Sequence, residues 1–530
     1  MKKFIVFLLV SVLTVAGAVS QQAFATSAPN SAATTITADA HQHDDHQTVS
    51  ADDGHHEADH HQAPAWTVIP FVLLLLMIAT GPLFYEHFWH HHYPKVAVGL
   101  AALVVGYYLL VMGNTHGPVH AFFEYVQFIA LLTGLYVASG GIMINVDRKG
   151  TPLANTALLL VGAVIANIIG TTGASMLLIR PFMRLNKQRI QPYHIVFFIF
   201  MVSNVGGCLT PIGDPPLFLG FLKGVPFFWT MTNNFDTWAF AIILLAGVFY
   251  FFDRHNNSKN ELEAEMAYNE ETINSGDATT TTVTTGNKKQ VYSGKITFTG
   301  SKNFAWLFVV VAAVFLDPNV FDWVPAIHYD GQKMSFIREI IMLAAAFFSY
   351  KFADKKALEG NGFNFEPIRE VAFIFIGIFG TMMPALELVG NFAKSPAGQA
   401  MINHNTLYWG TGALSGFLDN APTYLNFLAA SMASKGVELS SQADVQAFAA
   451  GTLHVGESSI FELTAISVAA VFFGAMTYIG NGPNFMVKSI AEQEGIKMPS
   501  FFGYIIRYSL PILFPILVLV WVLFFYYQVF

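Results

Sequence analysis

The sequence predicts an all-α polytopic membrane protein built from two inverted repeats, and three observations lead to that fold class. Hydrophobic residues make up 54% of the 530 residues and charged residues only 12%, about half the usual share in a soluble domain. The apolar residues fall in blocks near the roughly 20 residues that a helix needs to cross a bilayer. The same order of blocks occurs in both halves of the chain. This composition excludes a large water-soluble enzyme, and the lack of a strongly basic segment excludes a nucleic-acid-binding protein.

The N-terminus has the pattern of a secretory signal peptide over residues 1–25. Lys2 and Lys3 precede an apolar run over 4–19, and an Ala-Phe-Ala sequence at 23–25 provides a cleavage site. An uncleaved first helix is the alternative. In either case we expect the next segment outside the cytoplasm, because no Lys or Arg follows before the first apolar block.

Residues 26–65 form a polar segment that we expect to be disordered and external. Seven acidic residues are interleaved there with seven histidines, which are His41, His43, His46, His55, His56, His60 and His61. Imidazole and carboxylate groups bind zinc, copper and nickel, so this tail is a candidate for a weak metal site. A solvated tail without selected ligand geometry is the alternative.

The remaining apolar segments form two sets of six on either side of a polar stretch at 253–302, which we interpret as a cytoplasmic linker. The first repeat, 66–252, contains the segments 66–85, 95–113, 121–144, 153–180, 190–230 and 235–252. The second repeat, 303–530, contains 303–317, 335–353, 367–390, 406–432, 451–487 and 503–528. In each set, three plain spans are followed by an atypical segment, an interrupted span and a final plain span.

The distribution of basic residues predicts the orientation of the segments. The segment 153–180 is followed by a basic cluster, which consists of Arg180, Arg184, Lys187 and Arg189. This cluster stays in the cytoplasm only if the segment enters the membrane and turns back, and the Gly-Thr-Thr-Gly sequence at 170–173 suits such a turn. We therefore expect 153–180 to be a re-entrant hairpin, and 406–432 to be its counterpart from the other side.

The two interrupted spans share a motif. The sequence TPIGDPPLF at 210–218 aligns with TYIGNGPNF at 477–485, and five of the nine residues are identical. Its helix-breaking residues are Gly213, Pro215, Pro216, Gly480, Gly482 and Pro483. A broken helix leaves backbone groups unpaired inside the bilayer, which is tolerated where they line a cavity or are buried in protein. Paired interruptions in two halves are typical of a transporter binding site.

Two acidic residues lie at these special positions, Asp214 in the first break and Asp419 at the second hairpin tip. Around them we expect neutral oxygen donors, which are Thr171, Thr172, Thr210, Asn420, Thr423, Thr477 and Asn481. Carboxylates and neutral oxygens suit a small hard cation, and an acid at membrane depth is usually kept for ion or proton traffic. Helix capping is the alternative role for both acids.

Three further acids are candidates for a proton relay, namely Glu387, Glu457 and Glu462. An interfacial or packing role is the alternative for each of them.

With these motifs the chain resembles the ion transporter superfamily, which contains NhaD-type sodium:proton antiporters, arsenite permeases and carriers of citrate and dicarboxylates. The resemblance is carried by the sequences at 167–175, 203–216 and 418–423, and it looks closest to the antiporter branch. It implies two inverted repeats, two hairpins that meet two broken helices at the midplane, alternating access, and often a homodimer. One departure is the Thr171-Thr172 pair, where such antiporters commonly have Asp-Asn.

The sequence thus leads us to expect a secondary transporter, not an enzyme, that exchanges sodium ions for protons across the inner membrane. Sodium would be a substrate, and no cofactor is expected. The alternatives are a sodium-coupled symporter of citrate or a dicarboxylate, an arsenite-type permease, and a metal-handling protein that uses the histidine-rich tail.

Overall fold

The computed structural model describes residues 63–528 except 147–149, 188, 275–294, 319–320, 322, 330–331 and 453–454. The predicted signal peptide and the histidines of the tail lie outside the described residues. The described chain is almost entirely helical, and nine of its helices are long and apolar enough to cross a membrane. The prediction of an all-α polytopic membrane protein is therefore confirmed.

The first half begins with a short 3-10 turn, η1 (Ala65–Val68). It continues with α2 (Ile69–Phe84), α3 (Glu86–Leu110), α4 (His116–Gly140), β1 (Met143–Val146), α5 (Pro152–Leu185), α6 (Pro192–Met201), η2 (Val205–Leu209), α7 (Pro215–Lys223) and α8 (Trp229–Asn274). The interruption predicted within 190–230 is the stretch between α6 and α7, which contains the short 3-10 helix η2 and no α-helix.

The second half repeats this order with short additions at the loops. Its elements are β2 (Ile296–Thr299), α9 (Asn303–Val314), β3 (Ile327–Tyr329), β4 (Gln332–Met334), α10 (Ile337–Phe352), α11 (Lys355–Gly360), α12 (Glu366–Lys394), α13 (Pro396–Met401), α14 (His404–Ser415), α15 (Asn420–Ser434), α16 (Gln442–Ala450), α17 (Ser458–Phe473), η4 (Gly474–Met476), α18 (Gly482–Gln493) and α19 (Phe501–Tyr504). The last span continues as η5 (Ile505–Leu513), α20 (Phe514–Val520) and η6 (Trp521–Tyr526).

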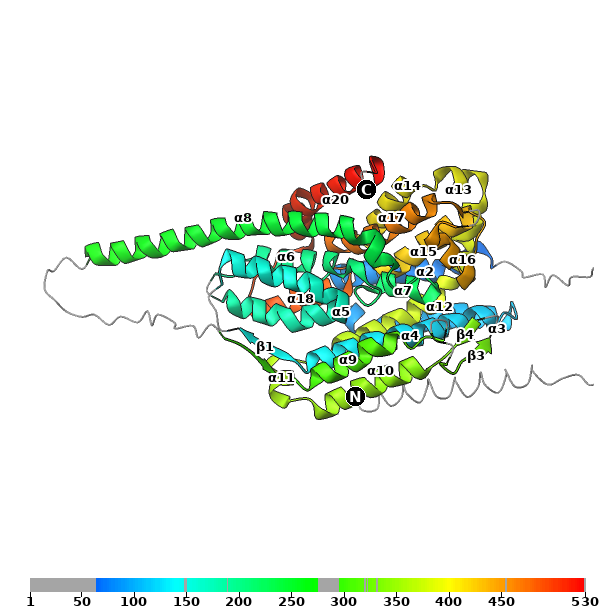
Figure 1. Ribbon diagram of the computed structural model, residues 1–530, viewed down its shortest axis with the longest axis horizontal. Helices are drawn as coiled ribbons and strands as arrows, with labels where there is room; N and C mark the ends of the chain where they lie inside the picture. The colour runs from blue at the N-terminus through cyan, green and yellow to red at the C-terminus, as the bar shows by residue number, and fades with distance from the viewer. Residues whose placement is uncertain are drawn as a thin grey trace, which may run out of the picture.

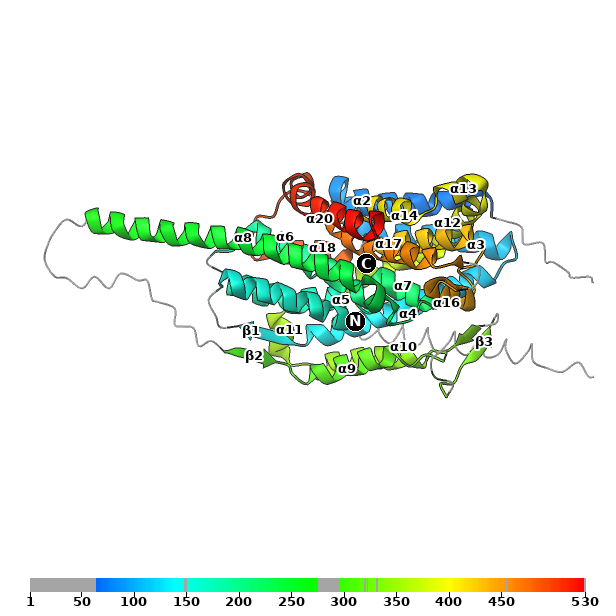
Figure 2. The ribbon, with the colours of Figure 1, turned by 45° about the horizontal axis from the view of Figure 1, so that its top comes forward.

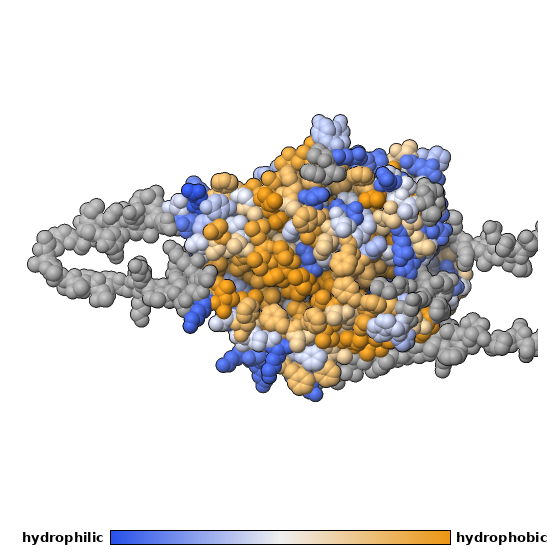
Figure 3. Space-filling view, viewed as in Figure 1, coloured by the Kyte–Doolittle hydropathy of each residue, from blue (hydrophilic) through white to orange (hydrophobic). Residues whose placement is uncertain are grey.

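The long helices run along the long axis of the molecule (Figures 1 and 2). On the face in Figure 3, apolar residues cover most of the middle, and hydrophilic residues gather toward the two ends. Many large apolar side chains of the described residues are exposed, such as Ile243 at 67% and Phe308 at 72%, which would be unfavourable in water. This is the surface that lipid chains require.

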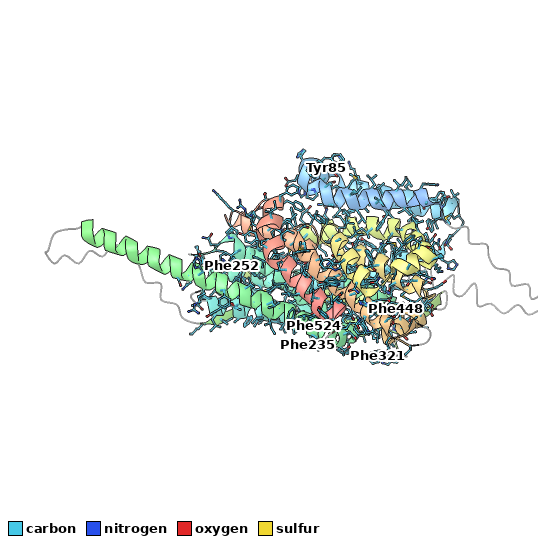
Figure 4. The ribbon with its side chains drawn as sticks, turned by 90° about the horizontal axis from the view of Figure 1, so that it is seen from above. Tyr85, Phe235, Phe252, Phe321, Phe448 and Phe524 are labelled. Atoms are coloured by element: carbon cyan, nitrogen blue, oxygen red, sulfur yellow. The ribbon has the colours of Figure 1, made fainter. Side chains whose placement is uncertain are left out.

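Aromatic packing joins the two halves inside this surface. The rings of Phe128 on α4 and Phe375 on α12 stack with centroids 4.4 Å apart. Helix α8 lies beside the C-terminal helices (Figure 4), where the rings of Phe240 and Phe524 are 5.7 Å apart. One apolar core therefore contains residues of both halves of the chain.

The segment 253–302 is more structured than a plain linker. Helix α8 continues to Asn274 and projects beyond the bundle (Figure 1). At the other end of the segment, β2 pairs antiparallel with β1, which follows α4. The two ends of this polar segment are thus a helix and a strand.

Helix α5 is a helical hairpin rather than one straight helix. Gly170 has φ 78° and ψ 154°, a conformation that essentially only glycine adopts, and the chain reverses there. The side chains of Asn155 and Asn186, near the two ends, exchange hydrogen bonds of 2.7 and 2.8 Å. This reciprocal pair holds the two arms side by side.

Helices α14 and α15 form a second hairpin, with residues 416–419 as its turn. The open end of the α5 hairpin lies beside β1, and that of the α14–α15 hairpin lies beside α13. These two places are at opposite ends of the molecule (Figure 1). Both hairpin tips consequently point toward its middle.

Candidate functional site

The two broken helices have the same local geometry. The backbone N–H of Gly213 donates to the Thr210 hydroxyl at 3.1 Å, and the N–H of Gly480 donates to the Thr477 hydroxyl, also at 3.1 Å. A Cβ atom at residue 213 would collide with the carbonyl oxygen of Gly207, and one at residue 480 would lie 2.6 Å from a backbone oxygen. The sequence motif is thus a repeated turn that requires glycine.

Each turn is tied to one hairpin tip by its threonine. The Thr210 hydroxyl donates to the carbonyl of Asn167 at 2.5 Å, and the Thr477 hydroxyl donates to the carbonyl of Gly416 at 2.7 Å. These two hydroxyls, expected among the ion ligands, are therefore engaged with backbone groups. Each hydroxyl holds one broken helix against the tip of one hairpin.

Asp214 is the residue that precedes α7, but its side chain does not cap that helix. Its backbone is extended, with φ −141° and ψ 145°, as at a normal N-cap. The first two residues of α7 are Pro215 and Pro216, which have no N–H to donate. The carboxylate is left available for partners from other segments.

Three side chains from three other segments donate to this carboxylate. Thr171 on the first hairpin donates to Oδ1 at 2.8 Å, and Asn481 in the second break donates to the same oxygen at 2.9 Å. Asn420 on the second hairpin donates to Oδ2 at 2.6 Å. All four side chains are at most 2% exposed. The structure thus brings together four of the predicted site residues, which we call the Asp214 cluster.

The Asp214 cluster carries a negative charge that no basic side chain of the described residues neutralises. Within the described part of the chain, Asp214 forms no ion pair with Lys, Arg or His, although a buried carboxylate is costly without one. The Asn420 side chain also has a buried Oδ1 atom without a hydrogen-bond partner among the described residues. A carboxylate and an unpaired amide oxygen, side by side, are chemically suited to a proton or a small cation.

A narrow cavity lies next to the Asp214 cluster, and its wall is mostly apolar. Its polar lining comes from Thr171, Thr172, Asp214 and Tyr136. No Lys, Arg or His contributes to it, and Asp419 is not in its wall. The expectation that both aspartates flank one cavity therefore stays a prediction.

Asp419 instead caps the helix that follows it. Its carboxylate accepts from the backbone N–H of Ala421 at 3.0 Å, and it is half-buried. Thr423 donates to the Asp419 carbonyl at 2.9 Å, within the same helix. Both residues therefore make contacts that shape the second hairpin tip and do not bond to Asp214.

Three asparagines form a hydrogen-bonded layer behind the cluster, and of these only Asn481 is among the predicted site residues. Asn481 also donates to Oδ1 of Asn204 at 3.2 Å, and Asn204 donates to Asn484 at 2.6 Å. Asn484 in turn donates to the carbonyls of Gly474 and Thr477. Asn484 belongs to the repeated motif and aligns with Leu217 of the first copy. A polar residue at an apolar position of the motif is the sequence signal that could have indicated this layer.

The three candidate relay acids lie away from the Asp214 cluster. Glu387 accepts from the Tyr108 hydroxyl at 2.9 Å, and Glu462 pairs with Lys435 at 2.9 Å. Glu457 is exposed just before α17. None of the three bonds to the Asp214 cluster, and the described residues hold no group of three or more His, Cys, Asp or Glu that could bind a metal ion.

Broken helices that meet two hairpin tips in the middle of an apolar bundle define a membrane transporter. The chain belongs to the family described as "Putative citrate transport", whose model matches residues 60–525. The match supports the wider resemblance to ion and citrate carriers, without singling out the antiporter branch. Comparison with curated proteins gives no match.

Proposed function

We propose that this protein is a secondary transporter that carries citrate, or a similar small carboxylate anion, together with sodium ions. The family match favours a citrate-type substrate over sodium:proton exchange as the main activity. The observation that carries the coupling is the Asp214 cluster. Among the described residues, its buried carboxylate has no ion pair and adjoins the Asn420 Oδ1 atom, which has no hydrogen-bond partner.

The charge of the cluster explains why a cation would be needed. Two negative charges 4 Å apart repel by about 4 kcal/mol at an effective dielectric constant near 20. A citrate carboxylate that entered beside Asp214 would meet this repulsion, because no basic side chain lines the cavity. A sodium ion held by Asp214 and Asn420 would offset it, so cation binding would precede anion binding.

Alternating access fits the placement of the hairpins. We propose that both are re-entrant, that the halves are inverted repeats, and that the open end of the α5 hairpin faces the cytoplasm. The basic residues Arg184 and Lys187 at that end support this orientation. The N-terminal tail would then lie outside, with the protein in the inner membrane of a bacterium.

Sodium:proton antiport is a second candidate, and one observation favours it. Asp214 forms no ion pair among the described residues, so it is free to exchange a proton for a sodium ion without breaking a salt bridge. The same residue would then serve both ions in turn.

Proteoliposomes that contain the full chain distinguish the two functions. An inward sodium gradient should drive accumulation of labelled citrate, and potassium should not replace sodium. Sodium-driven movement of protons without citrate uptake would favour the antiporter. Citrate uptake that ignores the sodium gradient would contradict the proposed coupling.

A further inference from the structure

Arg180 is a basic residue in an unusual place. It lies on the second arm of the α5 hairpin, five residues before that arm ends at Leu185. Its side chain is only 9% exposed. An arginine buried within an apolar segment is rare and usually serves a ligand or an ion path.

The guanidinium of Arg180 forms no ion pair among the described residues, and the acid that acts on it most strongly is Glu494, which is exposed. Its Nη1 atom is buried without a hydrogen-bond partner in the described part of the chain. By contrast, Arg184, one turn further along the same arm, is exposed and donates to Asn145 and to the carbonyl of Gly360. A buried unpaired guanidinium carries a large cost, which binding of an anion would offset.

The surroundings of Arg180 connect it to the cavity beside Asp214. A Cβ atom at Gly362 would lie 2.7 Å from Nη2 of Arg180, so the guanidinium lies against the loop between α11 and α12. The Tyr136 hydroxyl donates to Asn364 in the same loop at 2.9 Å. Tyr136 also lines the cavity. Its side chain therefore extends from the loop beside Arg180 to the cavity.

The second arm of the α5 hairpin also connects Arg180 to the cavity. Thr172 lines the cavity, Met176 packs in one apolar cluster with Tyr136, and Arg180 follows. Residues four apart lie on one face of a helix. Eight residues correspond to about 12 Å of helix, so Arg180 lies roughly that far from the cavity, toward the open end of the hairpin.

We propose that Arg180 is an anion subsite that receives a carboxylate group of the substrate between the cavity and the side to which the α5 hairpin opens. This inference rests on the proposed transport of a carboxylate anion. Arginine suits the role because its planar guanidinium binds a carboxylate through two parallel hydrogen bonds, which lysine cannot do. The cluster supplies the cation site, and Arg180 supplies the positive charge that the cavity lacks.

Citrate uptake measured separately in inside-out and right-side-out vesicles tests this subsite. Arg180→Gln should raise KM for citrate about 10-fold or more when citrate is offered from the side of the α5 opening, and much less from the other side. Arg180→Lys should give an intermediate KM. The matched control Arg184→Gln, on the same arm, should stay near the wild type.

The outcomes separate the subsite from a structural role and from the proposed function. A purely structural Arg180 would lower the melting temperature and slow uptake equally from both sides, which would overturn the subsite. If the wild type takes up citrate and Arg180→Gln has an unchanged KM, the subsite is overturned as well. If Arg180→Gln does not fold, an unchanged KM in Arg180→Lys has the same consequence. Failure of the wild type to carry citrate would instead overturn the proposed function and the subsite together.

Discussion

Asp214 and Asp419 each precede a helix, yet only Asp419 caps the helix that follows it. The difference comes from the next residues, because Pro215 and Pro216 have no N–H while Ala421 donates one. Asp214 is therefore shared among three other segments. The sequence indicated both acids, and the two prolines were the signal that could have separated their roles.

Replacing Asp214 should abolish coupling while leaving the fold intact. Asp214→Asn keeps the shape of the side chain but removes the charge that would hold a sodium ion. We expect citrate uptake driven by sodium to fall at least about 100-fold, since interactions with a charged group are worth roughly 1.5–3 kcal/mol each. The melting temperature should stay near that of the wild type. Unchanged sodium-driven uptake would exclude Asp214 from the cation site.

Asp419 should behave as a cap. Asp419→Asn preserves capping, since Asn is as good an N-cap as Asp, and should transport normally. Asp419→Ala should lower the free energy of unfolding by about 1 kcal/mol, measured by chemical denaturation in detergent. Loss of transport in Asp419→Asn at normal stability would instead place this carboxylate in the ion site.

At the scale of the element, the hairpins depend on a few backbone positions. Gly170 reverses the α5 hairpin with a positive φ, whereas Gly173 lies within a regular helix three residues later. A Cβ atom on Gly170 would also lie 3.2 Å from the backbone oxygen of Ile212 in the first break. The tip and the break are therefore built against each other.

Gly170→Ala should damage transport more than Gly173→Ala. The first change forces a conformation that costs about 1–3 kcal/mol, while the second adds a methyl group at ordinary contact distance. Uptake of labelled citrate, normalised to folded protein, measures the difference. Equal activity of the two variants would show that the reversal at Gly170 does not position Thr171 for function.

The sequence predicts the elements that are defined by hydropathy and by glycine and proline motifs. It does not predict those that depend on hydrogen bonds between segments far apart in the chain. The break at 210–216 and the tip at 170–173 follow from glycine and proline. The pairing of β1 with β2 does not, because the strands are short and far apart in the chain. The extension of α8 to Asn274 was also not predicted, since a polar segment without apolar periodicity resembles a loop.

At the scale of the whole molecule, the two hairpins open toward opposite ends, and labelling tests whether these ends face opposite sides of the membrane. In a Cys208→Ala background, cysteines at the exposed positions Lys187 and Glu438 should react with a membrane-impermeant thiol reagent from inside and outside, respectively. Reaction of both cysteines from one side would contradict the inverted arrangement.

The histidine-rich tail should be dispensable for transport. Residues 26–65 contain few large apolar residues that could pack onto the membrane bundle. A chain that lacks them should accumulate citrate at a rate within about twofold of the wild type, since surface segments of this kind contribute little to stability. Loss of uptake in a well-expressed deletion would favour the metal-handling alternative.

We infer that a cation at the Asp214 cluster offsets the repulsion between Asp214 and a carboxylate of the substrate. Calorimetry of the purified protein tests this inference most directly. Sodium should raise the affinity for citrate, and citrate should raise the affinity for sodium by the same factor, because coupling between two binding sites is reciprocal. We expect a factor of at least about 10, and no coupling in Asp214→Asn. Citrate binding that is equally tight with and without sodium, in the wild type, would contradict the account.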